Sequence, residues 1–257
     1  MRKQLLIYET AVPVTPARHA RHSVEVGVTY AFSAGINAVP LMAVELVRAA
    51  DEYAVVFTEV GGDVMPAVVL GVKGDQNLYL APDGHWTAKY LPAFLRRYPF
   101  VFASSPDNMT LTLCVDESCS GLNTAGRGER LFEANGSPTP FVANVLAFLK
   151  EYQGQFLRTQ AFGRRLRELG LLEPMQAQVT DANGSKLSLS GFLVVNRSKL
   201  RALAADQFEA LVKTDGLELI YLHLHSLRNF NDLKDRLLSA ARPLSLASAS
   251  STTSATG

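Results

Sequence analysis

The chain has 257 residues, of which 47% are hydrophobic and 19% are charged, and its formal net charge is +1. This composition is typical of a globular protein, and the balanced charge excludes the strongly basic surface of most nucleic-acid-binding proteins. The most apolar run, residues 64–72, is too short to span a membrane and contains Pro66. We therefore expect neither a nucleic-acid partner nor a membrane-spanning segment.

The N-terminus has a basic start, but only four consecutive apolar residues follow it, at positions 5–8. A signal peptide needs a longer apolar region and a cleavage site with small residues, so the expected compartment is the cytoplasm. The chain has two cysteines, Cys114 and Cys119. Two thiols are too few for a disulfide scaffold, and we favour a buried Cys114 over a local bridge.

The first 115 residues have mostly β-type patterns. Gly61 and Gly62 lie between two apolar runs, which predicts a β-hairpin. Pro40 suits the first position of a helix, so residues 36–50 predict a short helix that buries Leu41, Val44 and residues 46–47. Alternation and composition predict strands over residues 23–32, 53–59, 64–72, 77–81, 98–102 and 109–115.

The second half has mostly helical patterns. Thr139 and Pro140 are suited to the start of a helix, and apolar residues at helical spacing continue to Leu169, with a break or kink expected near Gly154 or Gly163. Further elements are predicted as a hairpin over residues 176–195, a helix over 198–213 broken near 205, a buried strand over 217–225 and a helix over 226–240.

Together these patterns predict an α+β fold. Its N-terminal half is rich in β-strands arranged as antiparallel hairpins, and the helices of its C-terminal half pack on the sheet. We expect a single domain over residues 1–240. The Ser-, Ala- and Thr-rich tail, residues 241–257, has too little apolar content to fold and is expected to be disordered.

Residues 83–102 concentrate aromatic side chains. Trp86, Tyr90 and Phe94 recur at a spacing of four, which predicts a helical or turn-rich segment with one aromatic face, and Arg96 and Arg97 follow. Such a cluster either forms core or lines a pocket for a sugar or an aromatic ligand, with arginines as hydrogen-bond donors. A buried arginine would need a carboxylate partner.

Residues 116–137 are rich in Gly, Ser and Asn and predict a long loop or lid. Within it, Gly126-Arg127-Gly128-Glu129-Arg130 offers backbone N–H groups and the guanidinium groups of Arg127 and Arg130. This stretch either binds an anion or forms a turn whose arginines pair with nearby carboxylates.

His223 and His225 are the most metal-like pair in the chain. On a strand, residues two apart project from the same face, where two imidazoles can reach one ion. The alternative is a pair of histidines hydrogen-bonded at the polar end of a buried strand. We favour the second interpretation and expect no metal and no other cofactor. The chain also has no P-loop, no H-E-x-x-H and no G-x-S-x-G motif.

Several long strings, in order, resemble the SapC family of bacterial proteins between about residues 5 and 237. They are LLIYETAVPV, RHSVEVG, NAVPLMAVE, NLYLAPDGHWTAKYLPAFLRRYPFVF, GRGERLF, FLKEYQGQFLRTQAF, LLEPMQAQV and LELIYLHLHSLRNF. The resemblance implies a role in surface-layer biogenesis or serum resistance. It also implies links to outer-membrane receptors and to glycan or aromatic uptake. It supplies no established reaction and no catalytic residues.

Two functions from different classes follow. The first is a non-enzymatic accessory or binding protein of a surface-layer or envelope-linked system, with surface-layer or outer-membrane transport components as partners. The second is an enzyme, or a binding protein for a glycan or aromatic ligand, whose site lies between residues 83–102 and residues 116–137. A deep pocket with convergent polar groups would favour the second, and a filled core would favour the first.

Overall fold

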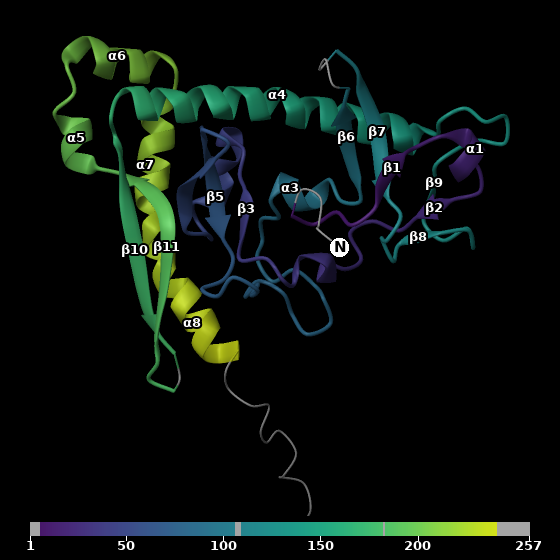
Figure 1. Cartoon of the computed structure of the whole chain (residues 1–257), viewed down its shortest axis with the longest axis horizontal. Helices are drawn as coiled ribbons and strands as arrows, with labels where there is room; N and C mark the ends of the chain where they lie inside the picture. The colour runs from purple at the N-terminus through teal and green to yellow at the C-terminus, as the bar shows by residue number, and fades with distance from the viewer. Residues whose placement is uncertain (1–5, 106–108, 182, 241–257) are drawn as a thin grey trace, which may run out of the picture.

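The structure, a computed structural model, describes residues 6–105, 109–181 and 183–240 (Figure 1). It has an α+β fold with three antiparallel sheets, and the N-terminal half is rich in strands, as predicted. The tail expected to be disordered, residues 241–257, lies outside the described residues.

The largest sheet has five strands in the order β10-β11-β4-β5-β3. Both predicted hairpins belong to it, and Leu193 of β11 pairs with Phe57 of β4 to join them. Gly61 and Gly62 form the turn of the first hairpin with positive φ angles of 59° and 89°, a conformation that glycine adopts without strain. The strands are β3 (Ala38–Pro40), β4 (Val55–Val60), β5 (Asp63–Val69), β10 (Leu172–Thr180) and β11 (Lys186–Val195).

Two smaller sheets have the orders β1-β7-β6 and β8-β2-β9. The outer strands of the second sheet come from within the predicted loop over residues 116–137, so part of that loop is paired with β2. The strands are β1 (Ala11–Pro13), β2 (Ser23–Val24), β6 (Phe100–Ser104), β7 (Leu111–Asp116), β8 (Leu122–Asn123) and β9 (Glu129–Arg130).

Helix α4 (Pro140–Glu168) connects these sheets. It runs along the molecule from the small sheets to the large one (Figure 1) and contributes buried side chains to all three hydrophobic clusters. Thr139 caps it by accepting a hydrogen bond from the Val142 N–H at 3.4 Å. Of the break or kink expected near Gly154 or Gly163, the break is wrong, because α4 continues through both glycines. Gly163 permits close packing instead: a Cβ there would lie 1.9 Å from the Val64 carbonyl oxygen of β5.

The remaining helices are mostly short. The break predicted near residue 205 is confirmed by the boundary between α5 and α6. In the described part of the chain, no helix is both long and apolar enough to cross a bilayer. The helices are α1 (Pro16–His19), α2 (Leu46–Ala49), α3 (Ala93–Arg96), α5 (Arg197–Arg201), α6 (Ala205–Lys213), α7 (Gly216–Ser226) and α8 (Phe230–Ala240), with single 3-10 turns η1 (Ala31–Ser33), η2 (Ala43–Glu45) and η3 (Leu227–Asn229).

The strand predicted over residues 217–225 is wrong, because these residues form helix α7. Its apolar residues serve two clusters, since Ile220 packs in one and Leu219 and Leu222 pack against another. A helix buried between two clusters is apolar on several faces, and over nine residues this pattern is indistinguishable from alternation.

Several N-terminal predictions are also wrong. Strand β2 ends at Val24, and the rest of residues 23–32 is irregular or 3-10. Residues 77–81 contribute only the isolated bridge between Leu80 and Trp86. Pro40 ends a strand instead of beginning a helix. The aromatic segment, by contrast, is turn-rich with one short helix, α3, directly after Pro92, which agrees with the prediction of a helical or turn-rich segment. These stretches are held by turns and side-chain hydrogen bonds, which periodicity does not reveal.

Candidate functional site

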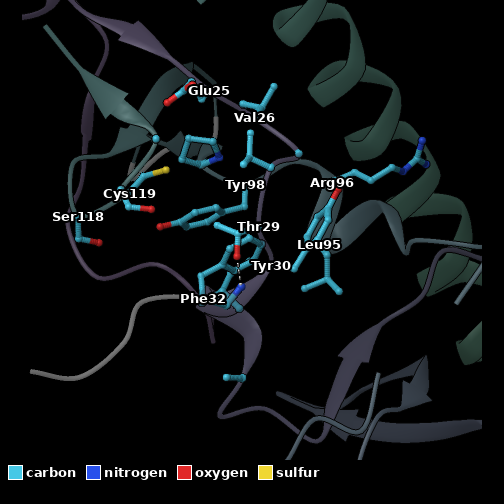
Figure 2. A pocket seen from close by; sticks show the side chains of 18 of the residues that line it. Glu25, Val26, Thr29, Tyr30, Phe32, Leu95, Arg96, Tyr98, Ser118 and Cys119 are labelled. Atoms are coloured by element: carbon cyan, nitrogen blue, oxygen red, sulfur yellow. Dashed lines mark hydrogen bonds between the residues drawn. The ribbon is translucent and has the colours of Figure 1, made fainter. Parts of the chain in front are cut away.

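A cleft of about 720 Å³, here called the Tyr98 cleft, lies between the two regions that the sequence singled out. Its walls come from residues 25–35, 91–99 and 118–121. The lining residues are Ile7, Glu9, Glu25, Val26, Gly27, Val28, Thr29, Tyr30, Ala31, Phe32, Ala34, Gly35, Leu91, Leu95, Arg96, Tyr98, Pro99, Ser118, Cys119, Ser120 and Gly121. Figure 2 shows the Tyr98 ring in the middle of this cleft, with its hydroxyl directed toward Ser118 and Cys119.

Aromatic rings form one side of the cleft. Phe32 stacks on Tyr98 with ring centroids 3.9 Å apart and an interplanar angle of 22°. Tyr30 lies next to Phe32 at 6.0 Å, and its other neighbour is Trp86 at 6.1 Å. All four side chains are partly exposed. The cleft therefore presents an apolar, planar wall to whatever enters it.

The opposite wall is fixed by Asp116, a fully buried carboxylate at the end of β7. One of its oxygens accepts from the Glu9 N–H at 2.8 Å, and the other accepts from Thr10 N–H and from the hydroxyl of Ser118 at 2.7 Å. Burial raises the pKa of Asp116, but the hydrogen bonds from Glu9, Ser118 and Thr10 outweigh it and the pKa is lowered. Asp116 thus positions both Glu9 and Ser118 at the cleft.

Gly121 brings two cleft segments together. The Glu25 N–H donates to the Gly121 carbonyl at 3.0 Å, and a Cβ on Gly121 would lie 2.2 Å from the Glu25 carbonyl oxygen. A side chain at this position would separate the two walls. On the other side of the same segment, the Ala31 N–H donates to Thr29 Oγ1 at 3.2 Å (Figure 2).

The cleft contains ionisable groups that stay neutral near pH 7. Burial raises the pKa of the Cys119 thiol, and burial is also the main reason why the pKa of the Tyr98 phenol is raised. A protonated thiol is a poor nucleophile. Neither histidine nor lysine is among the described residues that line the cleft. Cys119 and Tyr98 are therefore present in this lining as neutral hydrogen-bonding groups.

The loop arginines lie in and beside a turn at the edge of the cleft. Arg127 Nε lies 3.1 Å from the Glu25 carboxylate at the edge of the cleft, and the backbone of Arg130 pairs with Ser23 in the small sheet. Asn123 holds the turn, because its side chain accepts from the Arg127 N–H at 3.1 Å and donates to the Arg127 carbonyl at 3.0 Å. Arg127 does not itself line the cleft, but it contacts Glu25, which does.

Trp86 and Tyr90 belong to a closed network beside the cleft. The Trp86 indole donates to the Tyr53 hydroxyl at 3.0 Å and to the Tyr90 carbonyl at 3.1 Å. The Tyr90 hydroxyl donates to Glu45 at 2.6 Å, and this hydrogen bond adds to burial in raising the Tyr90 pKa. Neither Trp86 nor Tyr90 lines the Tyr98 cleft.

Arg96 and Arg97 point to different surroundings. Arg97 lies over the rings of Phe94 at 4.3 Å, Tyr152 at 4.8 Å and Tyr8 at 5.6 Å, so aromatic faces take the place of the expected carboxylate. Arg96 lines the cleft, but its exposed side chain extends toward α4 (Figure 2), where its guanidinium lies 5.4 Å from the Phe148 ring. The predicted carboxylate partner is wrong for both arginines within the described residues.

His223 and His225 do not form a pair, because α7 places residues two apart on different faces. His223 is buried: Nε2 accepts from the Val195 N–H at 3.1 Å, so Nδ1 carries the proton and donates to the Val55 carbonyl at 3.0 Å. Burial lowers the pKa of His223 to about 4. His225 is exposed, and the described residues contain no cluster of three or more metal-binding side chains.

His223 belongs instead to a buried polar stripe with Ser226 and Asn229 on successive turns of α7 and η3. Ser226 Oγ accepts from the Val55 N–H at 3.1 Å, and Asn229 donates to the carbonyls of Ala50 and Tyr53. The spacing of three between these polar residues is a helical signal that the sequence contained. This polar stripe therefore fixes α7 and η3 to the start of β4 and the residues before it.

Tyr30, Phe32 and Cys119 are cleft residues that the sequence reasoning did not select. The first two were expected on a half-buried strand, and Cys119 was given no role. The sequence did contain a sign that this segment is not a regular strand. Gly27 and Gly35 flank it, and glycine weakens a β-strand.

Comparisons with known proteins agree with the resemblance noted in the sequence. No curated protein and no solved structure matches the chain. The family model described as SapC matches residues 14–233, which include every residue that lines the Tyr98 cleft except Ile7 and Glu9. The match covers most of the 257 residues, and the chain therefore belongs to the SapC family.

Proposed function

We propose that this protein is a non-enzymatic binding protein that holds a small glycan or aromatic ligand in the Tyr98 cleft. The observation that carries the proposal is that stacked aromatic rings and polar side chains line one cavity of about 720 Å³. That volume lies in the range of small-molecule sites, which combine apolar surface with a few placed polar groups.

The two walls suit the two kinds of surface on a sugar ring. The stacked Phe32 and Tyr98 rings offer a flat apolar face to the C–H groups of a pyranose or to an aromatic ring. Ser118 and the carboxylates of Glu9 and Glu25 offer hydrogen-bonding groups to hydroxyls. Because the Arg96 guanidinium is directed toward α4, recognition inside the cleft does not depend on a negative charge on the ligand.

The state of the ionisable groups favours binding over catalysis. Cys119 is the strongest potential nucleophile in the lining, and burial keeps it protonated. Glu25 is engaged by Arg127. An enzyme site in the same cleft remains the alternative function, and it would need Glu9 or Glu25 to act as its base.

The setting of this binding activity follows from the SapC family. We propose that the protein serves a bacterial surface-layer or envelope-linked system, with surface-layer or outer-membrane transport components as partners. The formal net charge of +1 supports protein and small-molecule partners over nucleic acid.

The proposal is tested by titrating the protein with a panel of neutral mono- and oligosaccharides and simple aromatic compounds, using calorimetry. We expect saturable binding of at least one compound, and a loss of about tenfold or more in affinity for Phe32→Ala, because stacking on Tyr98 is removed. Phe208→Ala, which changes an exposed aromatic residue on α6, is the matched control. Failure of the panel to bind, or equal binding by both variants, would contradict the proposal.

A further inference from the structure

A second hollow of about 600 Å³, here called the Val47 groove, lies between the η2–α2 turn and α4. The sequence predicted Val44 and Val47 on the buried face of a helix, but they are 59% and 56% exposed. They are three residues apart on adjoining helical turns and line the groove together. Across it, Phe148 of α4 provides a third apolar side chain. The groove thus has an accessible apolar floor.

Two guanidinium groups border this floor. Arg48 follows Val47 on α2, and Arg96 reaches across from α3 to lie over the Phe148 ring at 5.4 Å. Both arginines are exposed, and in the described ranges neither has a carboxylate within 4.0 Å. An ion that reaches both would find two planar donors beside an apolar surface.

The carboxylates near the groove are already engaged. Glu45 is buried and accepts hydrogen bonds from Met42 N–H at 2.8 Å, Tyr90 hydroxyl at 2.6 Å and Ala93 N–H at 2.7 Å. Glu151 lines the groove and accepts from the Gln155 side chain at 2.7 Å. Of these two carboxylates only Glu151 is exposed, so it is the negative charge that would repel an anion entering the groove.

From this arrangement we infer that the Val47 groove is a second binding site, for a small amphipathic carboxylic acid. The carboxylate binds Arg48 and Arg96, and the aliphatic chain covers Val44, Val47 and Phe148. Charge complementarity selects this occupant over a neutral apolar one, because two unpaired guanidinium groups stay solvated at the groove until an anion neutralises them. The inference is independent of the ligand proposed for the Tyr98 cleft.

The test is calorimetric titration of the full chain with octanoate, and with 1-octanol as the neutral compound of the same chain length. We expect saturable binding of octanoate, weakened about tenfold or more in the double variant Arg48→Gln/Arg96→Gln, and weaker binding of octanol that the double variant leaves unchanged. Glu151→Gln is expected to strengthen octanoate binding, because it removes the opposing charge. Arg201→Gln, an exposed arginine on α5, is the matched control.

Three results would overturn the inference. They are no binding of octanoate to the wild type, equal affinity for octanoate and octanol, and unchanged octanoate affinity in the double variant. Phe32→Ala locates the site, since it alters the Tyr98 cleft and is expected to leave octanoate binding as it is. Thermal melting of each variant by circular dichroism checks the fold, which substitution of exposed arginines should preserve.

Discussion

The aromatic segment, residues 86–99, has two sides that differ in how their polar groups are satisfied. On the closed side, Trp86, Tyr90 and Phe94 pack inward, and the polar atoms of Trp86 and Tyr90 find partners in Tyr53 and Glu45. On the open side, Tyr98 faces a cleft. Trp86, Tyr90 and Tyr98 are all partly buried, and among these three only Tyr98 lines the cleft. The comparison shows that one aromatic-rich stretch builds both core and candidate site, and that the tertiary neighbours of each ring, rather than composition, separate the two roles.

The largest difference between the two sides should appear on removal of an aromatic ring. Phe94 is 4% exposed, so Phe94→Ala leaves a cavity and is expected to lower the free energy of unfolding by about 3–5 kcal/mol. Phe32→Ala is expected to cost less than half of that, since Phe32 is only partly buried. Urea denaturation of both variants makes the comparison. Equal losses would show that the Tyr98 cleft is as much a part of the core as Phe94.

The core between α7 and the large sheet should depend on pH through His223, which bonds to Val55 and Val195. Its pKa is lowered from 6.5 to about 4 by burial, so the folded state binds a proton less readily than the unfolded state. Stability is therefore complete above about pH 6.5 and falls as the pH drops from 6.5 toward 4, by on the order of 3 kcal/mol. Urea denaturation between pH 7 and pH 4 measures the loss.

Two variants separate this effect from other titrations. His223→Gln keeps a donor for Val55 and an acceptor for Val195 but does not titrate, so its stability should depend less on pH over that interval. His225→Gln changes an exposed residue of the same helix and should keep the wild-type dependence. The same pH dependence in all three proteins would contradict the assignment to His223.

Two glycines of α4 test how closely the helix is packed on the large sheet. A Cβ on Gly163 would lie 1.9 Å from the Val64 carbonyl oxygen, so Gly163→Ala should destabilise the fold by about 1–3 kcal/mol through displacement of the helix. Gly154 is exposed and has no such neighbour within 4 Å. Gly154→Ala should therefore stabilise by up to about 1 kcal/mol. Thermal unfolding of both variants would show whether the two changes have opposite signs.

The smallest effect is expected at the edge of the Tyr98 cleft. Glu25→Gln removes the charge that pairs with Arg127, and both side chains are substantially exposed. Exposed ion pairs contribute little, so the free energy of unfolding should change by less than about 1 kcal/mol. Urea denaturation at low and high salt checks this. A much larger loss of unfolding free energy would contradict this expectation and would show that the ion pair is needed to hold the cleft wall in place.

Local patterns determined a large part of this fold. Both hairpins of the five-stranded sheet, the strands β6 and β7, and the start of α4 at Pro140 follow from turn residues, alternation and capping. These signals are reliable because each depends on neighbours along the chain. The same strings carried the resemblance to the SapC family, which the family model confirms.

Contacts between distant residues decided the rest. Alternation in residues 217–225 predicted a strand, but two hydrophobic clusters enclose this segment and a helix serves both. Val44 and Val47 were expected to be buried and are exposed, because Leu41 and Leu46 fill the core beside them. Which aromatic residues line a cleft depends on how Gly121, Asp116 and the segment from residue 25 to 35 meet in space. Hydrophobic periodicity along the sequence does not predict these contacts, because each partner comes from a different part of the chain.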